Sequence, residues 1–310
     1  MDKGFRDDVV DELDKLEQQH ILPPTQQSEW TIPVLVVQKK NGSQRAFESS
    51  TPHSVESMSS QALRDAYKEQ FRARTYVDSY FTGEISFFQL EETHRLFQSD
   101  LIQGETILEV GSGPMIVNSL MISSRFKHIV LSDLVEENKL ELNKWINRDV
   151  DAIDWSLSAG QIAAIEGYGD IKKGAMEILE RTRAAIRKVV SCDVVEPAVL
   201  PVEHKETFDV VLSCGCLESA AAEHESYRRV VCNVATVVKP GGLLVILGVG
   251  GLKQYSVGTA DFTLANITGN VVNEAVTDAG LQIDLYRPRK IGRFSGSSDV
   301  FTFYLVARKA

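Results

Sequence analysis

Short apolar runs alternate with amphipathic stretches through most of this chain. The apolar runs predict strands at 107–110, 128–132, 189–194, 208–214, 243–247, 282–286 and 300–307. Between them, apolar residues recur every three or four positions, which predicts helices at 116–121, 142–150, 171–189, 227–238 and 271–279. Strands that alternate with helices form parallel sheets, and the last two strands suit a hairpin. The pattern therefore predicts an α/β fold with a mostly parallel sheet and helices on both faces.

A glycine turn follows the first predicted strand directly. Gly111-Ser112-Gly113-Pro114 separates that strand from a helical pattern that resumes at Ile116. Glycines allow a tight turn and let a ligand approach the backbone, as in nucleotide-binding βαβ units. A dinucleotide fingerprint would need a third glycine, and Ile116 stands there. Glu109, two residues before the first glycine, is typical of S-adenosylmethionine enzymes, and this cofactor is favoured over a dinucleotide.

Several polar side chains stand where predicted strands end. Asp133 ends the second strand, Asp193 closes the third, and Cys214 closes the fourth. The carboxyl ends of parallel strands meet at one edge of a sheet, where such folds bind ligands. A carboxylate in the place of Asp133 can accept hydrogen bonds from ribose hydroxyls. An alternative role for Asp133 is to cap the helix that follows it.

Aromatic residues gather just upstream of the glycine turn. They include Tyr67, Phe71, Tyr76, Tyr80 and Phe81. Such a group can be core packing, or it can present ring faces to a cationic sulfonium, an attraction worth about 0.5–2 kcal/mol. The sequence alone leaves both interpretations open.

Composition limits the classes of partner. The chain has 310 residues, 43% hydrophobic and 25% charged, with a net charge of −10, which argues against nucleic acid or anionic membranes as partners. No apolar run is long enough to span a bilayer, and no signal peptide is visible. The four cysteines fit no zinc spacing, so we expect no metal site. We expect a cytoplasmic monomer with reduced thiols that acts on a small molecule.

The first 60 residues differ from the rest and are predicted to be a separate extension that ends in a Ser-rich linker. Residues 9–47 resemble the start of the fingers region of retroelement reverse transcriptases. The matching motifs are Leu13-x-x-Leu16, Ser28-x-Trp30-x-x-Pro33-Val34 and Lys39-Lys40-Asn41-Gly42-Ser43. The resemblance ends before that family's catalytic aspartates, so it implies no polymerase activity. Residues 61–310 then form the main domain.

From Asp65 to Ala310 the chain resembles the small-molecule N-methyltransferases that act on nicotinamide, phenylethanolamine and indolethylamine. The motifs that carry the resemblance are Tyr76-x-x-x-Tyr80-Phe81, Gly111-Ser112-Gly113-Pro114, Ser132-Asp133-x-x-x-x-Asn138, Asp154-Trp155-Ser156, Cys192-Asp193-Val194 and Lys239-Pro240-Gly241-Gly242. The resemblance implies a Rossmann-like class I methyltransferase with a seven-stranded sheet and S-adenosylmethionine as cofactor.

The resemblance also implies a role for each matching residue. Gly111, Ser112 and Gly113 would lie along the methionine part of the cofactor. Asp133, with Asn138 beside it, would bind the ribose, and Asp193 and Val194 would hold the adenine. Tyr76 would cover the methyl donor as the catalytic residue, and Tyr80, Phe81, Met115 and Cys214 complete the implied cofactor site. Phe81 stands where the family often has a tyrosine, and that hydroxyl is missing here.

The methyl acceptor is less well specified. After the strand that ends at Leu247, similar enzymes place acidic or serine residues, whereas this chain has Gly248-Val249-Gly250-Gly251. The remaining substrate candidates are Glu218, Tyr255 and Asp299, and a structural role fits each equally well. We predict methyl transfer to a nitrogen of a small amine or pyridine-like molecule by in-line displacement. The alternatives are transfer to a thioether or thiol, and a catalytically silent protein that binds S-adenosylmethionine.

Overall fold

The protein is described here by a computed structural model that covers residues 59–80, 87–290 and 299–310. The predicted N-terminal extension, with its reverse-transcriptase resemblance, lies outside the described residues except for its last two positions. Phe81 also lies outside them. The division between the extension and the main domain stays a prediction.

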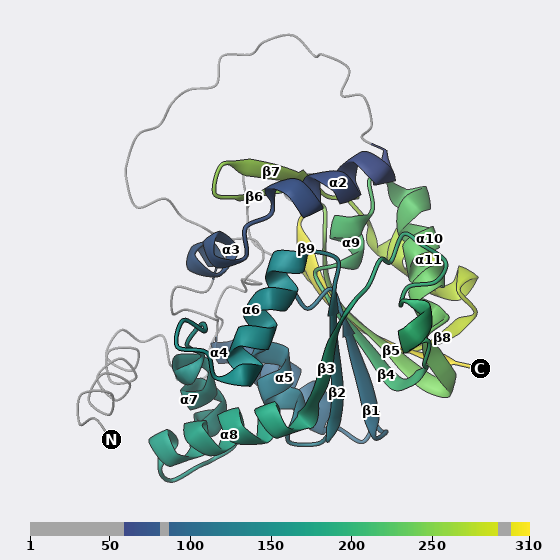
Figure 1. The fold of residues 1–310 in the computed structure, drawn as a ribbon. Helices are drawn as coiled ribbons and strands as arrows, with labels where there is room; N and C mark the ends of the chain where they lie inside the picture. Colours follow the sequence, from purple (N-terminus) through teal and green to yellow (C-terminus); the bar gives the residue numbers. More distant parts are fainter. Residues whose placement is uncertain (1–58, 81–86, 291–298) are drawn as a thin grey trace.

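The described residues form one main sheet with helices on both sides (Figure 1). The helices are α2 (Ser60–Gln70), α3 (Ala73–Tyr80), α4 (Phe87–Gln98), α5 (Val117–Ile122), α6 (Glu136–Asn147), α7 (Ser156–Ile165), α8 (Ile171–Ala185), α9 (Leu217–Ala220), α10 (His224–Ala235) and α11 (Gly269–Asp278), with the 3-10 turn η1 (Val202–His204). The strands are β1 (Thr106–Val110), β2 (His128–Asp133), β3 (Ile186–Ser191), β4 (Phe208–Cys214), β5 (Val238–Gly250), β6 (Gln254–Val257), β7 (Ala260–Thr263), β8 (Leu281–Lys290) and β9 (Phe301–Lys309).

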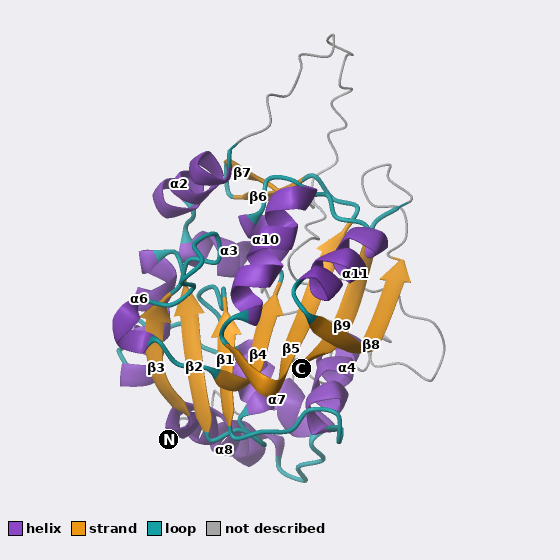
Figure 2. Ribbon diagram, turned by 90° about the vertical axis from the view of Figure 1, so that its right-hand side faces the viewer, coloured by secondary structure: helices purple, strands orange, loops and turns teal. Residues whose placement is uncertain are grey.

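The strand order of the main sheet confirms the predicted fold class. The order is β3-β2-β1-β4-β5-β9-β8, and the first five strands run parallel (Figure 2). β9 is antiparallel to both of its neighbours, β5 and β8, so the predicted C-terminal hairpin is present. The reversal of strand order on either side of β1 creates the crevice where ligands of such folds bind.

Alternating side chains of the strands build two separate cores. Leu108 and Val110 of β1 face the core shared with α10 and α11, whereas Ile107 faces the core shared with α4 to α8. A strand that is buried on both faces reads as a continuous apolar run, which is why the central strands were visible in the sequence.

Several predicted boundaries were wrong. The helices predicted at 142–150 and 227–238 occupy Glu136–Asn147 and His224–Ala235. The helix predicted to reach residue 189 ends at Ala185, and the strand predicted at 189–194 occupies Ile186–Ser191. The apolar residues between Ile186 and Val190 fit both the helical spacing of three to four residues and the alternation of a strand. Pairing of Ile186 with Ile129 and of Val189 with Leu131 in β2 favours the strand. The Lys239-Pro240-Gly241-Gly242 motif lies at an irregularity within β5, where Gly241 adopts a φ of 75°.

A cap of helices and a small hairpin lies over the carboxyl ends of the parallel strands. α2, α3, β6 and β7 gather at the end of the sheet toward which the arrowheads of β1 and β4 point (Figure 2). A third apolar cluster joins this cap to the sheet and contains Phe71, Tyr76, Val135, Val249, Leu252, Tyr255, Val257, Phe262, Leu264 and Val300. The sequence did not predict β6 and β7, because each is only four residues long. The cap therefore covers the edge of the sheet near which Asp133 and Asp193 lie.

Candidate active site

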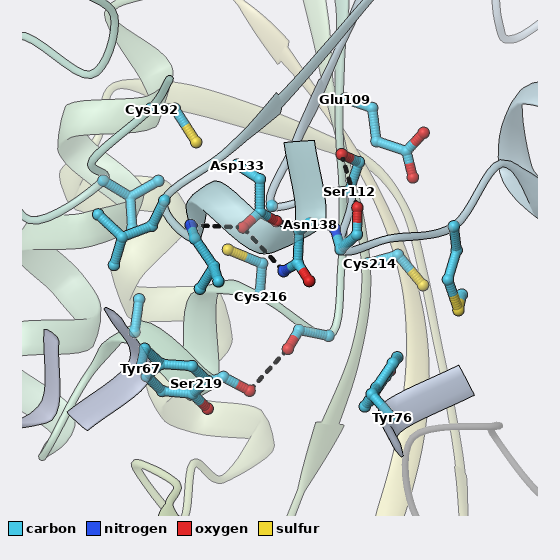
Figure 3. A pocket seen from close by; sticks show the side chains of 18 of the residues that line it. Tyr67, Tyr76, Glu109, Ser112, Asp133, Asn138, Cys192, Cys214, Cys216 and Ser219 are labelled. Atoms are coloured by element: carbon cyan, nitrogen blue, oxygen red, sulfur yellow. Dashed lines mark hydrogen bonds between the residues drawn. The ribbon is translucent and has the colours of Figure 1, made fainter. Parts of the chain in front are cut away.

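A pocket opens between the carboxyl ends of the parallel strands and the cap (Figure 3). The lining residues come from the glycine turn, the ends of β2 and β4, the loop after β3 and the helices α2, α3, α4 and α5. From the predicted cofactor set, the pocket is lined by Tyr76, Gly111, Ser112, Gly113, Met115, Asp133, Asn138, Asp193, Val194 and Cys214. The fold thus brings ten of the twelve predicted residues to one place. Tyr80 lies outside the lining, and Phe81 outside the described residues.

Asp133 organises the floor of the pocket. Its Oδ2 accepts a hydrogen bond from the Gly113 backbone N–H (2.8 Å). Its Oδ1 accepts from the Val135 backbone N–H (2.8 Å) and from Asn138 Nδ2 (3.0 Å). The N-cap residue of α6 is Val135, so Asp133 holds the turn before the helix and the glycine turn, rather than capping the helix. Burial raises the pKa of Asp133, while these three hydrogen bonds lower it.

The glycine turn has conformations that suit glycine. Gly111 and Gly113 have φ values of 66° and 62°, in the left-handed region that costs other residues strain. A Cβ atom on Gly111 would lie 2.2 Å from Cys216 Sγ. Two features therefore favour glycine at position 111: its positive φ, and the Cys216 thiol that packs against its Cα.

Glu109 is a buried carboxyl in the pocket lining. Its Oε1 accepts a hydrogen bond from Asn118 Nδ2 (2.8 Å), and its Oε2 has no partner among the described residues. Burial raises the pKa of Glu109 to about 7. The sequence indicated Glu109 as part of a motif. Its contact with Asn118, in the first turn of the next helix, follows only from the fold.

The loop after β3 brings an acidic residue beneath α2. Asp193 Oδ1 accepts from the Val195 backbone N–H (3.1 Å), and Oδ2 accepts from Arg64 Nη1 (2.7 Å). Arg64 comes from α2 and also contacts Glu196 (2.7 Å). Sequence reasoning missed Arg64, because 129 residues separate it from Asp193 and no local pattern joins them.

Aromatic side chains form the wall of the pocket below the cap. Tyr67 stacks on Phe262 with ring centroids 4.5 Å apart, and its hydroxyl lies 2.9 Å from the Tyr255 hydroxyl. Phe71 and Tyr76 pack together at 5.2 Å, and both line the pocket. The rings are therefore core and pocket wall at once, and their attraction to a sulfonium stays a prediction. Figure 3 shows Tyr67 and Tyr76 on the cap side of Asp133 and Asn138.

Tyr80 lies behind this wall. Its ring packs on Tyr76 at 5.1 Å, and its hydroxyl donates to the Ser256 carbonyl (2.5 Å). This bond ties α3 to β6 and directs the hydroxyl away from the lining. In this structure Tyr80 thus supports Tyr76 through ring packing.

The three substrate candidates occupy different environments. Tyr255 lines the pocket. Glu218 is 1% exposed and lies beside the lining, where its Oε1 accepts the Val249 backbone N–H (2.8 Å). Asp299 is exposed, outside the lining, with its backbone packed close to Gly251. Of the three, only Tyr255 reaches the pocket.

Phenylalanines of β9 fill the space beside the glycine-rich end of β5. A Cβ atom on Gly248 would lie 2.5 Å from Phe303 Cζ, and one on Gly250 would lie 2.3 Å from Phe301 Cε1. A side chain at Gly248 or Gly250 would therefore have to displace a phenylalanine ring of β9.

Three of the four cysteines, Cys192, Cys214 and Cys216, line the pocket. None of the four forms a disulfide, as predicted. Burial raises the pKa of Cys192 and of Cys214 to about 12, so both are neutral thiols at pH 7. No cluster of His, Cys, Asp and Glu in the described part of the chain suits a metal ion, and no helix there is long and apolar enough to cross a membrane.

The NNMT/PNMT/TEMT family model matches residues 59–310. The chain belongs to this family. It is 32% identical to indolethylamine N-methyltransferase of Oryctolagus cuniculus over 260 residues, which cover 79% of this chain and 95% of that protein. It is 30% identical to human nicotinamide N-methyltransferase over 255 residues, or 79% of this chain and 96% of that protein. Human phenylethanolamine N-methyltransferase matches at 26% over 233 residues, or 72% and 81% of the two chains. The family membership confirms the resemblance found in the sequence.

Proposed function

We propose that this protein is an S-adenosylmethionine-dependent methyltransferase that methylates a nitrogen atom of a small amine or pyridine-like molecule. The family match over the whole described domain carries this proposal. The three relatives named above are N-methyltransferases by name, which favours nitrogen over the sulfur of a thioether or thiol. We also propose that the protein is a cytoplasmic monomer without nucleic-acid or membrane partners.

The residues of the pocket fit the proposed cofactor. Asn138 Oδ1 and Glu109 Oε2 are buried acceptors without partners in the described structure, so they can receive donors from a ligand. Asp133 and Asn138 suit the ribose hydroxyls, and the open glycine backbone suits the methionine part. Asp193 and Val194 suit the adenine. When bound, S-adenosylmethionine supplies a methyl group on a cationic sulfur, which a nucleophile can displace.

The chain's own residues then orient and shield the reacting groups. Tyr67, Phe71 and Tyr76 exclude water from the pocket, and their ring faces attract positive charge. A neutral amine or ring nitrogen needs no strong base, so orientation and desolvation can supply roughly 7–11 kcal/mol of the barrier reduction. Tyr76 is 8% exposed, and burial holds its pKa above the usual range, so its hydroxyl stays neutral.

The acceptor end of the pocket differs from what an amide substrate needs. Glu218 lies outside the lining, where its Oε1 accepts the Val249 N–H, and Phe303 fills the space at Gly248. The lining hydroxyls have partners within the protein: those of Tyr67 and Tyr255 bond each other, and that of Ser219 donates to the Gly215 carbonyl. The hydroxyl of Thr93 lies 3.3 Å from that of Tyr304. We therefore propose an acceptor held mainly by apolar and aromatic contact, and we expect nicotinamide to be a poor substrate.

Transfer of a labelled methyl group tests the proposed function. The wild-type protein is incubated with labelled S-adenosylmethionine and a panel of pyridines, arylalkylamines, indoles and thioethers. Incorporation into at least one nitrogen compound is expected. Incorporation confined to thioethers would contradict nitrogen as the acceptor. Calorimetric binding of S-adenosylmethionine without transfer to any compound would favour the silent alternative.

A further inference from the structure

The guanidinium of Arg64 joins helix α2 to the loop after β3. Arg64 Nη1 contacts Asp193 Oδ2 and Glu196 Oε1, each at 2.7 Å, and Nη2 donates to Gln61 within the helix. The side chains of Arg64 and Asp193 are only 16% and 21% exposed. Ion pairs that are partly shielded from solvent are screened less than fully exposed pairs, so this contact should be stronger than a typical surface ion pair.

Both members of this ion pair line the pocket. Leu63, Arg64 and Tyr67 of α2 form one side, and Asp193, Val194 and Val195 lie opposite them. Arg64 Nε is buried and has no partner among the described residues, so the guanidinium still has a donor to offer. A ligand in this part of the pocket would lie beneath α2 and beside the Arg64–Asp193 pair.

Arg64 also fixes the direction of the Asp193 carboxylate. The Val195 N–H binds Oδ1 and Arg64 binds Oδ2, so both oxygens are held in place before any ligand arrives. Preorganised acceptors bind a ligand without the cost of ordering them. Each oxygen keeps a second lone pair for an exocyclic amino group such as that of adenine.

We propose that Arg64 is a positioning residue for the adenine end of the cofactor. It holds the Asp193 carboxylate ready for the adenine amino group and keeps α2 closed over that end of the pocket. This inference rests on the proposed function, because it takes S-adenosylmethionine as the ligand. Loss of the Arg64–Asp193 contact should therefore weaken the cofactor mainly by speeding its dissociation.

The test compares Arg64→Met with Glu196→Gln in the full chain. Glu196 contacts the same guanidinium from outside the pocket lining and is 55% exposed, so it serves as the matched control. Calorimetry with S-adenosylmethionine, S-adenosylhomocysteine and adenosine measures affinity, and stopped-flow displacement measures dissociation. Arg64→Met should weaken all three ligands by about tenfold, mainly through faster dissociation. Glu196→Gln should change each affinity by less than about threefold, as expected for an exposed pair.

Two measurements distinguish a role of Arg64 in positioning Asp193 from a general effect on the stability of the fold. Adenosine lacks the methionine part, so its affinity should fall as much as that of S-adenosylmethionine. Amide hydrogen exchange in α2 of the ligand-free variant should rise as well, while the thermal midpoint confirms folding. If Arg64→Met does not fold, Arg64→Lys takes its place, and a loss of adenosine affinity of at least threefold is expected because lysine cannot bridge two carboxylates in the same way.

Unchanged adenosine affinity in a folded Arg64 variant would overturn this inference alone. Failure of the wild-type protein to bind S-adenosylmethionine would overturn the proposed function, and this inference with it.

Discussion

Replacement of Asp133 by asparagine tests the core of the cofactor assignment. The carboxylate accepts three hydrogen bonds, from the N–H groups of Gly113 and Val135 and from Asn138 Nδ2, and the residue is 5% exposed. Asparagine has one acceptor oxygen and one NH₂ group. In its best orientation the oxygen keeps the bonds from Val135 and Asn138, and the NH₂ group then faces the Gly113 N–H.

The structure predicts that this substitution lowers both the free energy of unfolding and the affinity for S-adenosylmethionine. A buried donor left without an acceptor costs about 1–3 kcal/mol, so the free energy of unfolding should fall by that amount. The ribose hydroxyls would lose a charged acceptor, which should weaken S-adenosylmethionine by about 1.5–3 kcal/mol, or at least tenfold. The contact with the Gly113 N–H is the reason to expect a loss of stability besides the loss of affinity.

A matched control separates the two costs. Asp209 accepts the backbone N–H groups of Glu105 and Thr106 and pairs with Lys239, at the opposite ends of the strands from the pocket. Asp209→Asn should lower stability and leave the calorimetric affinity for S-adenosylmethionine unchanged. Asp133→Asn should lower both. A folded Asp133→Asn protein that binds S-adenosylmethionine as tightly as the wild type would remove Asp133 from the site and refute the reasoning.

Three further predictions concern the acceptor, the pH dependence and the N-terminus. Gly248→Asp should lose about 1–3 kcal/mol of stability because its Cβ meets Phe303, and it should not create nicotinamide turnover; turnover near a typical enzyme's ~10 per second, in the variant or the wild type, would contradict this. Burial raises the pKa of Glu218 to about 7, above the value of about 4.3 in unfolded chains, so the folded state binds this proton more tightly. The resulting stability is present below pH 4 and is lost as pH rises through 7, by up to ~1.4 kcal/mol per pH unit; urea titrations at pH 5, 6 and 7 should show a smaller slope in Glu218→Gln than in the wild type, with the slope from the pKa of Glu109, also raised to about 7, left in both, and an equal slope in both proteins would disprove the assignment. Deletion of residues 1–52, which precede the family match, should leave the thermal midpoint and the cofactor affinity nearly unchanged; a large fall in either would show that this segment works with the domain.

The sequence by itself determined the fold class and the cofactor end of the pocket. Central strands buried on both faces leave continuous apolar runs, and the glycine turn leaves its mark in consecutive residues. Because parallel strands end at a common edge, it was enough to place Asp133 at the end of one strand and Asp193 near the end of another to bring both to one pocket. Each of these inferences needs only residues that are neighbours in the chain.

Only the tertiary structure decided how the roof and the acceptor end are built. Arg64 meets Asp193 across 129 residues, Phe303 fills the space at Gly248, and Tyr67 bonds Tyr255 across the cap. The tertiary structure also placed Glu218 beside the pocket rather than in its lining. Contacts of this kind depend on which faces pack together and how much space remains between them. Packing of distant segments leaves no period or spacing in a single sequence, so these features could be seen only after the chain was folded.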